Sequence, residues 1–101
     1  MIKPADIKTE EDIKNVIKEV LKNKRVKVYL FGSRAKGTNT PRSDLDIAFL
    51  SDEDISYELS LLREIFEESH LIFFVDVVDL SKTGEEFKNT VLKEGRLWIS
   101  L

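Results

Sequence analysis

The chain has 101 residues, a length typical of one domain, and we expect a single domain over residues 1–101. Apolar residues make up 42% and charged residues 35%, a balance that excludes an intrinsically disordered chain. Cysteine is absent, which excludes disulfides and thiolate chemistry, and the net charge of -3 lacks the strongly basic balance of a nucleic-acid-binding domain.

A helix is predicted over residues 10–23. Thr9 is a typical N-cap residue, acidic residues fill the turn that follows it, and apolar residues then recur at helical spacing. Residues 26–31, VKVYLF, alternate and are rich in β-branched and aromatic side chains, so they predict the first strand.

Gly32-Ser33 ends this strand. A short helical turn is expected over 34–36, and a loop containing a proline over 38–43. Residues 44–50 predict the second strand, which begins with two aspartates one residue apart.

The second half of the chain repeats the alternation of helices and strands. The predicted elements are a helix capped by residues 51–54 and running to about 69, a buried strand over 71–78, a helix capped by Ser81 or Thr83 and ending at Gly95, and a short strand over 97–99. This order predicts an α+β (α/β) domain: a small mixed sheet with helices packed mainly on one face.

Asp44 and Asp46 are two residues apart, so on a strand they point to the same face. Two carboxylates side by side repel each other, and a divalent cation with oxygen ligands would offset that repulsion. No histidine or cysteine lies nearby, which argues against zinc. The alternative is structural, with Asp44 capping a turn and Asp46 at a solvated strand end.

Gly32-Ser33 stands between an apolar strand and a helical turn. Glycine lets the backbone approach a ligand closely, and the backbone N–H groups of such a turn suit phosphate oxygens. Alone the pair indicates only a turn, and both the Walker spacing and the GxGxxG fingerprint are absent.

The spacing of these residues, Gly32-Ser33-x10-Asp44-x-Asp46, resembles the signature of the DNA polymerase β-like nucleotidyltransferase superfamily. More narrowly, the chain resembles the minimal nucleotidyltransferases, the MNT-domain proteins that are often paired with a HEPN-domain partner. The similarity extends over nearly the whole chain, from the leading helix to the closing KEG. It implies the nucleotidyltransferase fold and a third carboxylate on a later strand.

FFVDVVDL offers two candidates for this third carboxylate, Asp76 and Asp79. They are three residues apart and face opposite sides of a regular strand. We prefer Asp76, because an acid within the apolar run is costly to desolvate unless it is paired or metal-bound. Asp79, near the strand end, has an easier role in a solvated turn.

The resemblance implies a two-metal mechanism with Mg²⁺ or Mn²⁺ and ATP as substrate. Asp44, Asp46 and Asp76 would bind the metals and catalyse transfer, and Gly32, Ser33 and Arg34 would bind the nucleotide. Lys36 and Arg42, with Arg34, could also neutralise charge on the leaving pyrophosphate, although surface solvation explains such residues equally well.

The expected activity is transfer of a nucleoside monophosphate, AMP from ATP, to a hydroxyl. By resemblance, the acceptor is a tyrosine of a HEPN toxin that the transfer neutralises. Two alternatives remain open: an antitoxin that acts by association alone, and transfer to a small-molecule hydroxyl. The chain lacks the helical domain that completes the cleft in larger relatives, so a partner or a homodimer would supply the missing surface.

The start of the chain, MIKPADIKTEED, lacks the apolar segment of a secretory signal peptide, and no run of residues approaches the length of a membrane span. We therefore expect a cytoplasmic protein that acts outside membranes and does not bind nucleic acid directly.

Overall fold

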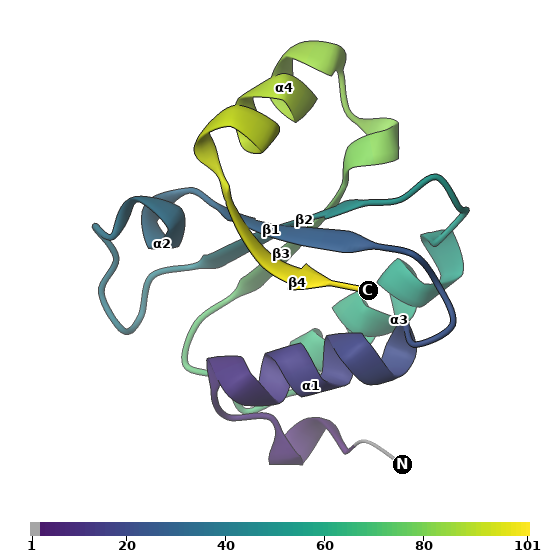
Figure 1. Ribbon diagram of the computed structural model, residues 1–101. Coiled ribbons are helices and arrows are strands. Elements are labelled where there is room, and N and C mark those ends of the chain that lie inside the picture. The colour runs from purple at the N-terminus through teal and green to yellow at the C-terminus, as the bar shows by residue number, and fades with distance from the viewer. Residues whose placement is uncertain (1–2) are drawn as a thin grey trace.

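Four strands form one sheet in the order β3-β2-β1-β4 in the computed structural model, which describes residues 3–101 (Figure 1). Residues 1–2 of the predicted domain lie outside the described part. The strands are β1 (Lys27–Phe31), β2 (Leu45–Leu50), β3 (Val75–Asp79) and β4 (Arg96–Ser100). The helices are α1 (Glu10–Val20), α2 (Ser33–Lys36), α3 (Ser56–Glu67) and α4 (Glu85–Glu94), with 3-10 turns at Pro4–Asp6 and Leu80–Lys82.

The sheet is mixed because its strands are connected in two ways. β1 pairs antiparallel with both β2 and β4, whereas β2 and β3 are parallel. Parallel neighbours require a long crossover, and α3 provides it. The register brings Asp46 of β2 opposite Phe31 of β1 on one side and Asp76 of β3 on the other.

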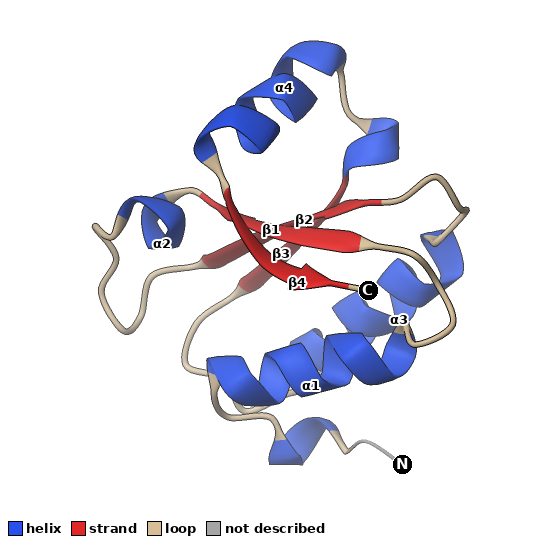
Figure 2. Ribbon diagram, viewed as in Figure 1, coloured by secondary structure: helices blue, strands red, loops and turns tan. Residues whose placement is uncertain are grey.

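Helices cover the two faces of the sheet unequally. In Figure 2, α1 and α3 lie on one side of the strands and α4 on the other. The larger core lies against α1 and α3, and the smaller one joins Ala48, Leu80 and Val91 beneath α4. The prediction of a small mixed sheet with helices mainly on one face is confirmed, with α4 as the element on the second face.

Caps define the start of α1 as the sequence predicts. The Thr9 side chain accepts a hydrogen bond from the Asp12 N–H at 3.1 Å, and the Asp12 carboxylate accepts from the Thr9 N–H at 3.0 Å, which forms a capping box. The helix itself ends at Val20, three residues earlier than predicted.

The predicted caps of the later helices are wrong. α3 has Ile55 at its N-cap, and the Asp54 carboxylate instead accepts from the Ser56 N–H at 3.0 Å. α4 begins after Gly84, because residues 80–82 form a 3-10 turn that Asp79 caps. Local turn-forming side chains competed here for the same backbone donors.

The predicted strand over 71–78 is also too long at its start. β3 begins at Val75, opposite Leu45, the first residue of β2. Residues 71–74 lie beyond the start of β2 and therefore have no partner strand. One hydrogen bond, from the Leu45 N–H to the Phe74 carbonyl at 2.8 Å, joins this segment to β2. Strand propensity alone does not extend a ladder beyond its partner.

Within residues 3–101, no helix combines the length and the apolarity that crossing a membrane would require.

Candidate active site

Three carboxylates lie at one end of β2 and β3. Asp44 is the residue before β2, Asp46 is the second residue of that strand, and Asp76 is opposite Asp46 in the parallel register. Asp46 is partly buried, while Asp44 and Asp76 are exposed. The register puts Asp46 beside Asp76, and Asp44, two residues before Asp46, is near enough for its charge to act on Asp46, so the three aspartates lie near one another on the face that α4 covers only in part.

The Gly-Ser turn lies directly against this group. Gly32 adopts φ +71° and ψ -152°, a conformation available essentially to glycine alone. A Cβ at Gly32 would overlap with Oδ2 of Asp46 and lie 3.2 Å from its carboxyl carbon. The missing side chain therefore lets the backbone turn and the carboxylate share one small space.

The environment raises the pKa of the Asp46 carboxyl above the ordinary aspartate value of 3.8. Burial is the largest cause, followed by the negative charges of Asp76 and then Asp44; Arg34 acts in the opposite direction. The protein thus holds three like charges near one another with incomplete compensation, an arrangement typical of functional sites.

The chemistry of these donors fits a divalent cation that prefers oxygen ligands. Three carboxylates without histidine or cysteine suit Mg²⁺ or Mn²⁺ better than zinc. Among the described residues, however, no three carboxylate, histidine or cysteine side chains already form a cluster able to hold a metal ion. The side chains would have to turn toward one another as a cation binds.

The register favours Asp76 over Asp79 as the third carboxylate, but the physical reason given from the sequence is wrong. Asp76 is exposed, so it avoids the predicted desolvation penalty. Asp79, at the far end of β3, is the buried residue with 8% exposure. Its carboxylate accepts hydrogen bonds from the Ser81 N–H at 3.0 Å and the Ser81 hydroxyl at 2.7 Å.

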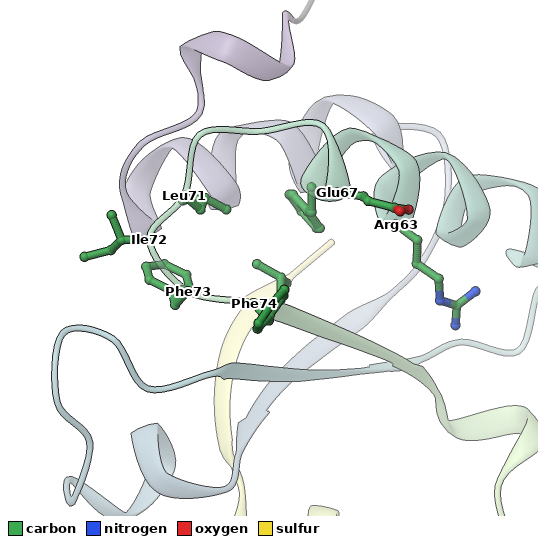
Figure 3. Close-up of a pocket in the computed structure, with 8 residues that line it drawn as sticks. Arg63, Glu67, Leu71, Ile72, Phe73 and Phe74 are labelled. Atoms are coloured by element: carbon green, nitrogen blue, oxygen red, sulfur yellow. The ribbon is translucent and has the colours of Figure 1, made fainter.

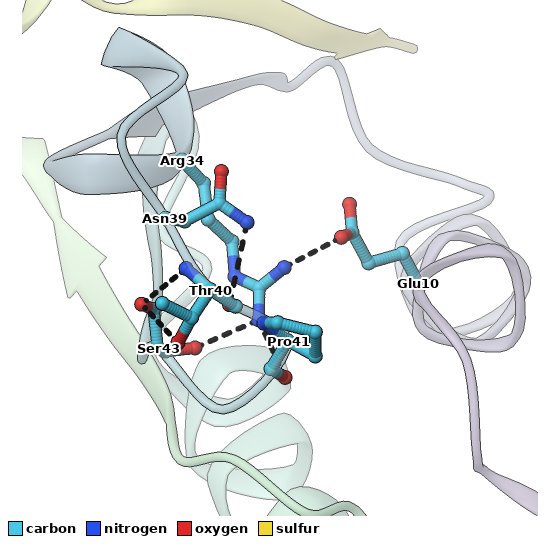
Figure 4. Close-up of polar contacts among 6 residues, drawn as sticks. All are labelled: Glu10, Arg34, Asn39, Thr40, Pro41 and Ser43. Atoms are coloured by element: carbon cyan, nitrogen blue, oxygen red, sulfur yellow. Dashed lines mark hydrogen bonds and ion pairs between the residues drawn. The ribbon is translucent and has the colours of Figure 1, made fainter.

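Arg34 points away from the open side of the turn and into the protein (Figure 4). Its guanidinium donates to Glu10 Oε2 at 2.8 Å and to the Ser43 carbonyl at 2.7 Å, and it lies 4.4 Å from the ring centroid of Phe73. The side chain is buried, with 9% exposure. These contacts favour a positioning role, and nucleotide binding by Arg34 stays a prediction.

The loop between the Gly-Ser turn and the aspartates is held at a fixed span. Arg34 holds its C-terminal end, and the Ser43 hydroxyl accepts from the Thr40 N–H at 2.8 Å (Figure 4). Sequence reasoning missed this bracing, although an arginine directly after the turn and a serine directly before Asp44 were the available signals.

The remaining candidates are less constrained. Ser33 begins α2 and is partly buried, and Lys36 and Arg42 are exposed on the same turn and loop. Their predicted contacts with phosphate stay predictions.

The sequence and the fold both match known proteins. The family described as "Polymerase beta, Nucleotidyltransferase" matches residues 11–100. The protein named "Probable protein adenylyltransferase MntA" of Haemophilus influenzae is 36% identical over 91 residues, covering 87% of this chain and 78% of that protein.

A crystal structure of a toxin–antitoxin with AMP-PNP matches with a TM-score of 0.64 and 27% identity, over 87% of this chain and 73% of that chain. A mutant of the toxin–antitoxin MntA–HepT matches with a TM-score of 0.71 and 26% identity, over 92% and 73% of the two chains.

Proposed function

The chain belongs to the polymerase beta nucleotidyltransferase family, and from this premise we propose that it transfers AMP from ATP to a tyrosine hydroxyl of a HEPN-domain partner and so acts as an antitoxin. Residues 1–101 would form a single minimal nucleotidyltransferase domain.

One observation carries the proposal: the backbone of Gly32 lies against the Asp46 carboxylate, which in turn is opposite Asp76. A turn suited to phosphate oxygens is therefore adjacent to carboxylates that suit a cation bound to the same phosphates. If the aspartates had only a structural role, the fold would not need a glycine beside Asp46, whose carboxylate is already repelled by neighbouring aspartates.

In the proposed reaction the acceptor hydroxyl oxygen forms a bond to the α-phosphorus of ATP. The bond from that phosphorus to the oxygen bridging to the β-phosphorus breaks, and pyrophosphate leaves with the electron pair. The hydroxyl proton passes to the Asp76 carboxylate or to water. Ser33 and the backbone beside it would hold the leaving phosphates.

Asp44, Asp46 and Asp76 would hold the divalent cations. When bound, such ions neutralise phosphate charge and lower the pKa of the attacking hydroxyl. This chain contributes the orientation: the register fixes Asp46 beside Asp76, and Gly32 keeps the space next to Asp46 open.

The partner part of the proposal is supported by the relatives. The relative from Haemophilus influenzae is named "Probable protein adenylyltransferase MntA", and two of the matching structures are toxin–antitoxins, one of them with AMP-PNP. We extend both features to this chain, with a HEPN-domain toxin as the partner and ATP as the nucleotide.

The test is transfer of label. The protein is incubated with MgCl₂ and the HEPN-domain protein of the same organism, once with ATP labelled at the α-phosphate and once at the γ-phosphate. We expect the partner to be labelled only from the α-phosphate, with loss of label in EDTA or in Asp46→Asn. Asp79→Asn is the matched control, since it removes a carboxylate from the same sheet but outside the site.

Two results would contradict the proposal. Label from the γ-phosphate would indicate a kinase. A complex that forms and silences the toxin without any label would indicate an antitoxin that acts by association alone, the alternative left open by the sequence.

A further inference from the structure

Phe74 is the most exposed large apolar side chain within residues 3–101, at 82%. It directly precedes β3 and lines a groove with residues of α3 (Figure 3). An aromatic ring so open to water is unfavourable by itself, and exposed apolar surface next to a polar site often marks a place where another molecule binds.

The exposure of Phe74 does not come from a loose backbone. Its carbonyl accepts a hydrogen bond from the Leu45 N–H at 2.8 Å, which holds its backbone next to the start of β2. The neighbours Phe73 and Val75 both pack against the larger core, and Phe73 also stacks beneath Arg34. These two partly buried neighbours direct Phe74 toward the opposite face.

That face is the one with the carboxylates. Phe74 and Asp76 are two residues apart, and the hydrogen bond from the Leu45 N–H keeps the backbone of Phe74 in line with β3, so strand alternation directs the two side chains toward the same side of the sheet. Across the sheet, the Gly32 turn follows β1, Asp46 is on β2, and Asp76 is on β3, the edge strand, with Phe74 directly before it.

This order sets the direction of the reaction. In an in-line displacement the attacking oxygen approaches opposite the leaving group. With the leaving phosphates at the Gly32 turn, on the β1 side, the acceptor must arrive from the β3 edge. Among the described residues no further strand or helix extends the sheet beyond β3 there, and Phe74 stands beside Asp76 on that path.

We propose that Phe74 is the acceptor-positioning residue: its ring packs against the aromatic ring of the incoming hydroxyl-bearing side chain and directs that hydroxyl to Asp76. The inference rests on the proposed function. An aromatic acceptor fits best, because offset or edge-to-face packing between two rings fixes orientation as well as contact.

The groove beside Phe74 extends the same apolar surface around the edge of the sheet. It has a volume of about 440 Å³ and is lined by Phe66, Leu71 and Ile72, with Arg63 and Glu67 from α3 (Figure 3). Ile72 is itself exposed. The molecule that fills this groove would be a segment of the partner protein: its acceptor side chain packs against Phe74, and an apolar residue next to the acceptor in sequence enters the groove.

The test separates the acceptor from the nucleotide. Initial rates of partner labelling are measured against partner and against ATP concentration for wild type, Phe74→Ala, Phe74→Trp and Tyr57→Ala. Tyr57 is the matched control, because it is 76% exposed but lies on α3 at the opposite end of β2. We expect Phe74→Ala to raise the KM for the partner about tenfold or more, as loss of a packed aromatic ring does. The KM for ATP should stay within about twofold, Phe74→Trp should retain most activity, and Tyr57→Ala should match wild type.

Several outcomes overturn the inference. An unchanged partner KM in Phe74→Ala would remove Phe74 from acceptor positioning, and a raised ATP KM would assign it to the nucleobase. Equal losses in Phe74→Ala and Tyr57→Ala would indicate general instability instead of positioning.

Photocrosslinking keeps the inference testable even if no label is transferred. With p-benzoylphenylalanine in place of Phe74, illumination of the complex should link the chain to the partner, whereas the same group in place of Tyr57 should not. Wild type that labels nothing, together with a crosslink from position 74, would sink the catalytic proposal alone. A crosslink only to a second copy of this chain would overturn partner docking at Phe74.

Discussion

The two ends of β3 each have an aspartate, and the protein uses them in opposite ways. Asp79 is buried and receives two hydrogen bonds from Ser81, so its charge is well solvated by the protein. Asp76 is exposed and lies opposite Asp46, a second carboxylate, in the register. At one end of β3 the aspartate is stabilised by nearby hydrogen-bond donors, whereas at the other end two negatively charged carboxylates lie side by side.

This difference distinguishes a structural aspartate from a candidate functional one within a single strand. A buried acid with donors stabilises the fold, because removing it would leave those donors unpaired. Carboxylates that repel one another and raise the pKa of Asp46 do not stabilise the fold, so another purpose must keep them together.

The largest expected effect is on catalysis at the Asp76 end. Asp76→Asn keeps the shape of the side chain but removes the charge, and we expect transfer of label to fall by about 10²–10⁴-fold, the range for loss of a catalytic acid–base group. Asp79→Asn should retain activity per folded molecule. Equal loss in both variants would mean that the two ends of β3 are not functionally distinct.

Gly32→Ala should come next. The new Cβ would overlap with the Asp46 carboxylate and force it aside, and displacement of a catalytic group by about 1 Å can cost about 100-fold in rate. Gly37→Ala is the matched control, since Gly37 also has a positive φ, +73°, but nothing lies within 4 Å of its added Cβ.

Both glycine variants should lose stability, because a side chain is strained at positive φ. The rate, normalised to the folded fraction from circular dichroism, should fall only in Gly32→Ala. A similar normalised rate in the two variants would show that the contact with Asp46 does not matter for transfer.

Asp79→Ala tests the structural end of the strand. It removes the acceptor for both Ser81 donors and the cap of the 3-10 turn, so we expect the free energy of unfolding to fall by about 1–2 kcal/mol. Denaturant unfolding measures the change, with Asp76→Ala as the control. A larger loss of stability in Asp76→Ala would invert the comparison.

Much of the fold follows from the sequence, because the apolar periodicity is strong where an element has one buried face. α1 and β1 were predicted within three residues at each end for this reason. Element ends were less predictable where several turn formers compete, as between Asp79 and Glu85. The start of β3 depends on its partner strand, which local sequence does not encode.

The candidate site was also predictable in part from the sequence. Strand periodicity places Asp44 and Asp46 on one face, but the position of Asp76 opposite Asp46 depends on the register of a parallel pair. Burial was a poor guide to the third carboxylate, because the desolvation cost expected for Asp76 falls on Asp79. The internal contacts of Arg34 and the open face of Phe74 are tertiary features that no local pattern reveals.

The smallest predicted effect is on the stability of the carboxylate end and depends on pH. The pKa of Asp46 is raised in the folded protein, so the folded state binds the proton more tightly than the unfolded chain. Stability from this group is therefore fully present below the ordinary aspartate pKa of 3.8 and is lost as the pH rises through the folded pKa. Asp46→Asn removes the charge and should raise Tm at neutral pH in EDTA, with the difference from wild type vanishing below pH 3.8. Asp12→Asn should show the opposite sign, since hydrogen bonds from the Lys8 N–H and from Thr9 lower the pKa of that carboxyl. A lower Tm for Asp46→Asn at neutral pH would show that its carboxylate stabilises the fold, as Asp79 does.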